Sequence, residues 1–274
     1  NPFDFNLWKP AKPDEPYWES PWGKGRPGWH IECSAMSYEY LGKSFDIHGG
    51  GKDLIFPHHE NEIAQSEALF AQQYVKYWLH NGFVDINNEK MSKSLGNFTM
   101  IKTVLEQYSA EVIRMFLLSK HYRSPIDYSE ESMKEVARGL DRVYTFLERL
   151  DNAEIEPDIA KNGDIWEEFI ECMNNDFNSA KALAAVFLAV KKGNRLLDEM
   201  EEDRKKAHAN AAELALLYKD ILSAGHILGI FILSPAEYFK SKKQQGMSDQ
   251  TIDPTFVDDL IQQRNKARKE KDFK

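Results

Sequence analysis

Two lysines three residues apart, Lys90 and Lys93, lie in a polar stretch that also contains Ser92, Ser94 and Gly96. Two ammonium groups at this spacing can close over a phosphate chain and neutralise the charge that develops as pyrophosphate leaves. The serine hydroxyls and the backbone near the glycine add hydrogen-bond donors. Most such lysine pairs are solvated turns, so the pair alone assigns no function. We interpret the stretch as a mobile loop that holds a triphosphate.

A second set of chemically capable residues consists of Cys33, His58 and Glu62. His58 and Glu62 are four residues apart on an expected helix, so both side chains project from one face. Zinc accepts thiolate, imidazole and carboxylate together, and three protein ligands leave one coordination position open for substrate. A lone cysteine is more often a small core residue. The polar residues that follow Gly49-Gly50-Gly51 favour a metal site over packing.

Two other residues are weaker candidates for this metal site. Cys172 is surrounded by Trp166, Phe169, Ile170 and Met173 at helical spacing, which indicates the core of a bundle and makes it a poor fourth ligand. His59 follows a candidate ligand on another face of the helix. We therefore expect His59 either to support a metal ligand through a hydrogen bond or to face solvent.

The elements that must position these residues follow an α/β pattern. Phe45–His48 reads as a strand that stops at three glycines, a helix is expected from Pro57, and strands are expected at 77–80 and 82–86, before the lysine loop. Six of the eleven prolines lie in the first 27 residues, which excludes long helices there.

From about residue 100 the sequence becomes helical. Ser109 and Ser129 are expected N-caps, and apolar residues recur every three or four positions between 130 and 236, which predicts a helical bundle. The stripes contain Met133, Val136, Leu140, Val143, Leu147 and Leu150, then Leu183, Val186, Phe187, Val190 and Leu197, then Leu214, Leu217, Ile221 and Leu228. Lys240 to Pro254 reads as a linker, and a helix is expected from Phe256.

Composition limits the class of protein. The chain has 274 residues, 42% hydrophobic and 29% charged, as in a globular protein of two or three domains. No apolar run approaches a membrane-spanning length, and no secretory signal is recognisable, so we expect a cytoplasmic protein that does not contact a membrane. Two unlike cysteines argue against a disulfide framework. A net charge of −9 confines any contact with a polyanion to a local basic patch, for which the last eleven residues are a candidate.

Several motifs together resemble one enzyme family. Lys90-Met91-Ser92-Lys93-Ser94 matches the KMSKS signature of class I aminoacyl-tRNA synthetases. The segments 28–36, 45–51 and 56–65 resemble cysteinyl-tRNA synthetases, strongly up to about residue 130 and more loosely beyond it, as at 173–178.

This resemblance implies a two-step ligase that makes cysteinyl-adenylate from L-cysteine and ATP, with magnesium, and transfers the acyl group to tRNA(Cys). It implies one zinc ion that binds the substrate thiol, held by Cys33, His58 and Glu62. Lys90 and Lys93 are then catalytic, with Lys93 at ATP. Trp29 and Asp53 are expected to contact the cysteine substrate.

The fold class that the resemblance implies is α/β plus all-α, in a monomer. The expected parts are the end of a connective insertion at 1–27 and the second half of a Rossmann-type nucleotide-binding domain at 28–98. They are followed by a stem-contact region at 99–150, a tRNA-binding helical bundle at 151–238, and a linker with the start of an anticodon-binding region at 239–274. The HIGH signature and the early cysteine that would be a fourth zinc ligand do not occur. We therefore expect a fragment that does not make adenylate by itself.

Three other functions remain open from the sequence. A cysteine-activating ligase of mycothiol biosynthesis uses the same activation chemistry on an amino sugar, but gives no reason for the long helical region and the basic end. A metallohydrolase would use Glu60 to activate a zinc-bound water, which leaves the lysine loop unexplained. A non-catalytic tRNA-binding module would show affinity that falls steeply with salt.

Overall fold

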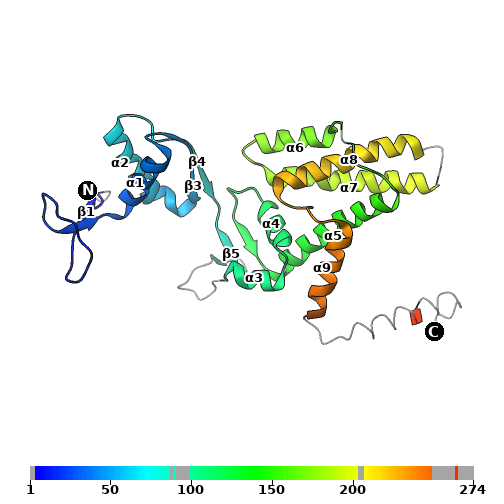
Figure 1. The fold of residues 1–274 in the computed structure, drawn as a ribbon, viewed down its shortest axis with the longest axis horizontal. Coiled ribbons are helices and arrows are strands. Elements are labelled where there is room, and N and C mark those ends of the chain that lie inside the picture. The colour runs from blue at the N-terminus through cyan, green and yellow to red at the C-terminus, as the bar shows by residue number, and fades with distance from the viewer. Residues whose placement is uncertain are drawn as a thin grey trace. The chain divides into compact units, whose positions relative to one another are not determined.

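The computed structural model describes residues 4–86, 89–90, 99–158, 160–202, 207–248 and 263–264. The chain divides into two compact units, an α/β unit and a helical unit, whose elements are labelled in Figure 1. The α/β unit consists of Asn1–Val104 and Ser119–Ser132, and the helical unit consists of Leu105–Leu118 and Met133–Lys274. The expected order of an α/β part followed by a helical part is confirmed.

The proline-rich start of the chain forms a small antiparallel pair of strands, β1 (Trp8–Pro10) and β2 (Gly25–Pro27). Trp18 extends this pair, because its backbone N–H and C=O bond those of Gly25 at 2.8 and 3.1 Å. Gly25 is required there, since a Cβ would lie 2.3 Å from the Trp8 indole nitrogen. The expected absence of long helices in this segment is confirmed for its described residues.

The centre of the α/β unit is a parallel pair of strands joined by helical turns and a helix. The elements in order are α1 (Trp29–Leu41), β3 (Phe45–Gly51), the helical turns η1 (Lys52–Leu54) and η2 (Ile55–His59), α2 (Glu60–Phe70) and β4 (Val75–Asn81). In the parallel pairing, His48 lies opposite Trp78 and Gly50 opposite His80. Because side chains alternate along a strand, His48 and His80 project from the same face of this sheet.

A three-stranded sheet follows, with strand order β6-β5-β7. Its strands are β5 (Val84–Ile86), β6 (Glu89–Lys90) and β7 (Ile126–Tyr128). The backbone of Lys90 pairs with Asp85 in the antiparallel ladder between β5 and β6. Lys90 therefore belongs to a strand and not to the loop expected from the sequence, while Lys93 lies outside the described residues.

The remaining elements are helices, and α6, α7 and α8 pack side by side (Figure 1). They are α3 (Ile101–Gln107), α4 (Ala110–Leu118), α5 (Glu130–Asn152), α6 (Asp164–Asn174), α7 (Ser179–Glu202), α8 (Ala207–Leu228) and α9 (Pro235–Ser248). Within the described part of the chain, no helix is long and apolar enough to cross a membrane.

The helix signals read from the sequence are confirmed in detail. The Ser109 hydroxyl accepts a hydrogen bond from the Val112 N–H at 3.3 Å, and that of Ser129 accepts one from Ser132 at 3.2 Å, so both serines are N-caps. Of the predicted α5 stripe, only Val136 is not fully buried. Cys172 is buried on α6, as its apolar neighbours predicted.

Two segments differ from the sequence prediction. α9 continues to Ser248, so the prediction of a linker from Lys240 was wrong for residues 240–248. The polar composition of that segment was misleading, because α9 needs only its first turns, near Tyr238, to pack. Cys33 lies within α1, a helix that was not predicted from the sequence. α1 was missed because Ser34 is its only fully buried residue, so it has no apolar stripe.

The packing of α5 against α7 gives a stability prediction. At Gly193 a Cβ would lie 2.2 Å from the Phe146 ring, whereas at Gly139 it would meet the flexible end of Met115 at 3.2 Å. We expect Gly193→Ala to lower the free energy of unfolding by about 1–3 kcal/mol through overpacking. Gly139→Ala is the matched control and should cost less, since a Cβ there meets its neighbours at 3.2 and 3.3 Å, while the gain in helix propensity is the same at both positions. Urea unfolding followed by circular dichroism measures both, and equal stability of the two variants would contradict this packing.

Candidate metal and substrate site

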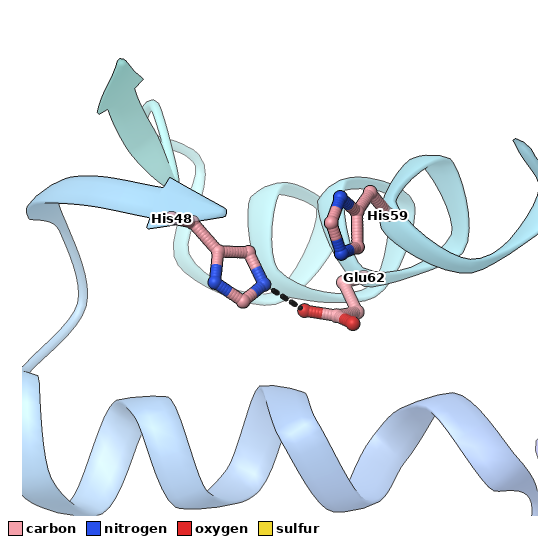
Figure 2. Close-up of side chains that lie close together, drawn as sticks. All are labelled: His48, His59 and Glu62. Atoms are coloured by element: carbon pink, nitrogen blue, oxygen red, sulfur yellow. Dashed lines mark hydrogen bonds and ion pairs between the residues drawn. The ribbon is translucent and has the colours of Figure 1, made fainter. Parts of the chain in front are cut away.

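Glu62 is the buried acidic residue at the centre of the α/β unit. It lies in the first turn of α2 with only 4% of its surface exposed. Figure 2 shows His48 on β3 and His59 at the start of the α2 region directed toward it. Among the described residues, these three are the group whose possible ligand atoms all lie within 4.8 Å of one another. Two imidazoles and a carboxylate are donors that zinc accepts.

The two imidazoles of this group have defined partners. His48 Nε2 lies 2.8 Å from Glu62 Oε2, and His59 Nδ1 lies 2.8 Å from His80 Nε2. Burial, followed by the neighbouring His48, lowers the pKa of His59. His59 is therefore neutral near pH 7, which is the form that can donate a nitrogen lone pair to a metal.

Cys33 approaches Glu62 from helix α1. Burial is the main cause that raises the pKa of the Cys33 thiol, and the negative charges of Glu62 and Glu32 raise it further. The thiol is therefore protonated near neutral pH. A metal ion at this position would reverse that preference, because a coordinating thiol is deprotonated.

His58 is turned toward a different neighbour. Its Nδ1 lies 3.0 Å from His30 Nε2, and its ring centroid is 6.3 Å from that of Trp29. Burial, followed by the charge of His58, lowers the pKa of His30. Trp29 is 73% exposed at the start of α1, so its indole borders the histidine cluster without closing it.

Of the three ligands expected from the sequence, Glu62 belongs to the compact group of possible ligands among the described residues. Cys33 and His58 lie outside that group. His59 is 5% exposed, so a solvent role for it was wrong. Sequence reasoning gave no role to His48, although strand alternation places it on the same face as His80.

Asp53, Lys90 and Lys93 are the other site residues expected from the sequence. Asp53 lies exposed in η1, directly after β3, with its carboxylate folded back over Gly51. This is the carboxyl end of a parallel strand, where α/β sheets place ligands. The backbone of Lys90 forms β6, whereas its side chain and all of Lys93 lie outside the described residues.

Comparison with known families supplies the decisive observation. Residues 1–138 match the description "tRNA synthetases class I (C) catalytic domain", and residues 168–232 match the DALR domain. The chain belongs to the class I tRNA synthetases. The expected fold class, an α/β catalytic part followed by an all-α part, is confirmed for this synthetase chain.

Its similar proteins are named as cysteine–tRNA ligases. The synthetase chain is 53% identical over 285 residues to the Geobacter sulfurreducens ligase and 50% identical over 286 residues to that of Trichlorobacter lovleyi. These matches cover 100% of the chain but 58% of each relative, so the synthetase chain spans somewhat more than half their length. Among solved structures, LeuRS of Agrobacterium radiobacter, in a ternary complex with tRNA and LeuAMS, matches with a TM-score of 0.54. That match has 18% identity and covers 76% of this chain and 31% of LeuRS, which indicates a shared fold.

Proposed function

We propose that the chain is the part of a cysteine–tRNA ligase that recognises cysteine and contributes to its activation. The whole enzyme would join cysteine to ATP as cysteinyl-adenylate and transfer the acyl group to tRNA(Cys). The observation that carries this proposal is the identity of about half of all residues to cysteine–tRNA ligases over the complete chain. Their shared name also favours tRNA over the amino sugar of mycothiol biosynthesis as acceptor.

Zinc is the proposed cofactor, held by Cys33, His58 and Glu62. The donor types support it, since two imidazoles and the buried Glu62 carboxylate form one compact group, and the charge of that carboxylate raises the pKa of the Cys33 thiol. Zinc bound there would supply a soft Lewis acid that favours a thiolate over a hydroxyl. Cysteine and serine differ by one atom, so a pocket that relied on shape alone would discriminate poorly between them.

The remaining residues are proposed to bind and orient the substrates. Trp29 would cover the cysteine side chain beside His58, and Asp53 would pair with the substrate ammonium group from the end of β3. Lys90 and Lys93 would neutralise the phosphates of ATP and its magnesium complex. Strand β6 supports this placement, because the lysine stretch begins in β6, which pairs with β5.

The domain assignment made from the sequence is kept as a proposal. The region 99–150 would contact the tRNA stem, and the helical bundle at 151–238 would also bind tRNA. A monomer in the cytoplasm remains the expected state.

A hybrid enzyme tests the function directly. This chain would replace the aligned stretch of the Geobacter sulfurreducens cysteine–tRNA ligase, of which it covers 58%. We expect the hybrid to charge tRNA(Cys) with cysteine and not with serine, and Lys93→Ala in the hybrid to abolish charging. A hybrid that melts cooperatively and binds tRNA(Cys) but does not form cysteinyl-adenylate would contradict the proposal and favour a non-catalytic tRNA-binding module.

A further inference from the structure

The carboxylate of Glu62 has a defined hydrogen-bond partner on strand β3, because His48 Nε2 lies 2.8 Å from Oε2. A carboxylate can only accept, so Nε2 of His48 carries the hydrogen and donates it. The partner of this proposed metal ligand is therefore a residue that has no assigned role.

The imidazole of His48 is itself held in place by aromatic rings. Trp78 packs against it at a centroid distance of 4.8 Å and an interplanar angle of 61°, and Phe45 meets it edge-on at 5.7 Å. Tyr74 lies at 6.3 Å, and Phe45 and Tyr74 are both buried in the small apolar cluster of this unit. His48 therefore presents Nε2 to Glu62 from a fixed position (Figure 2).

We propose that His48 is a positioning residue that fixes the Glu62 carboxylate in the orientation needed to bind zinc. Ligating carboxylates are generally hydrogen-bonded in turn, and loss of such a partner typically weakens metal binding by about 10–100-fold. With Oε2 engaged by His48, the other oxygen of Glu62 is left for the metal. This inference rests on the zinc site of the proposed function.

A competing arrangement uses the same atoms differently. Since His48, His59 and Glu62 form a compact group of possible ligands, His48 would then bind the metal itself. The two roles need different chemistry from residue 48. A positioning residue needs only a donor at the place of Nε2, whereas a ligand needs an unprotonated nitrogen there.

Two substitutions at this position separate the roles. A glutamine places an amide N–H close to the position of Nε2 but is a poor zinc ligand, whereas alanine removes both properties. We expect His48→Gln to bind zinc nearly as tightly as the unchanged chain, and His48→Ala to bind it about 10–100-fold more weakly. Zinc affinity is measured on the 274-residue chain by competition with a chromophoric chelator. His226 is an exposed histidine on α8, so His226→Gln is the control and should leave the zinc affinity unchanged.

Three results would overturn the inference. If glutamine and alanine weakened zinc binding equally, His48 would be a metal ligand. If His48→Ala left the zinc affinity unchanged, His48 would have no part in zinc binding. If the unchanged chain had no measurable zinc affinity, the proposed zinc site would be wrong. The melting temperature of the metal-free variants distinguishes positioning from packing, because lost rigidity of the fold would lower it in His48→Ala before any metal is added. Charging of tRNA by the hybrid enzyme is a separate readout, so its failure and the failure of this inference are distinguishable.

Discussion

Replacement of Glu62 by alanine is expected to lower cysteine activation by the hybrid enzyme at least about a hundredfold, because even loss of a residue next to a metal ligand costs 10–100-fold. Cys33→Ser should have a comparable effect, since a serine hydroxyl does not replace a thiolate as a zinc ligand. Cysteine-dependent ATP–pyrophosphate exchange and the zinc content of the purified protein measure the two consequences together.

Glu60→Ala is the matched control for Glu62→Ala. Both glutamates lie in the first turn of α2, but Glu60 is exposed and Glu62 is buried against His48. The control should retain zinc and activity. If Glu60→Ala were inactive while Glu62→Ala activated cysteine normally, the metal assignment would be wrong, and hydrolysis with Glu60 as the base would become the better interpretation.

Replacement of Glu111 by alanine is expected to destabilise the helical unit strongly. The Glu111 carboxylate accepts hydrogen bonds from the Tyr144 hydroxyl at 2.8 and 3.0 Å and from the Phe231 N–H, and it is 9% exposed. Its removal leaves two buried donors unpaired, each of which costs about 1–3 kcal/mol. We therefore expect a loss of about 2–5 kcal/mol in the free energy of unfolding, measured by urea denaturation.

The same residue connects distant parts of the sequence. Burial raises the pKa of Glu111, partly offset by the hydrogen bonds it accepts, and its partner Tyr144 stacks on Tyr238 of α9 at 3.8 Å. Glu111 thus fixes the connection between α8 and α9 to α4. Glu237→Ala is the control, because Glu237 is an exposed capping residue bonded to Ser234 and should cost only about 0.5–2 kcal/mol. A smaller loss for Glu111→Ala than for Glu237→Ala would contradict this account.

The sequence predicted the helical unit well because its buried apolar residues recur with the period of a helix. The stripe from Met133 to Leu150 has the period of a helix and needs one buried face, so the period alone identifies that face. The continuation of α9 beyond residue 239 was not predicted, because α9 packs mainly through Tyr238, which stacks on Tyr144, and has no long apolar stripe. Tertiary contacts of this kind leave no periodic signal.

The candidate site was only partly predictable, for a geometric reason. Spacing predicted that His58 and Glu62 project from one face of one helix, but His58 lies in η2 and Glu62 in α2. Which side chains converge on Glu62 depends on how the elements around α2 pack, and that packing brings His48 to its carboxylate while His58 faces His30. Motif spacing carries no information on such rotations. The role of Lys93 stays a prediction from the sequence, outside the described residues.

X-ray absorption at the zinc edge of the zinc-loaded 274-residue chain tests the central claim most directly, because it reports the atoms bound to the metal. We predict a sulfur scatterer that disappears in Cys33→Ala, and a further sulfur when free cysteine is added but not when serine is added. A spectrum with only nitrogen and oxygen neighbours, unchanged by cysteine, would contradict the proposed recognition of the substrate thiol.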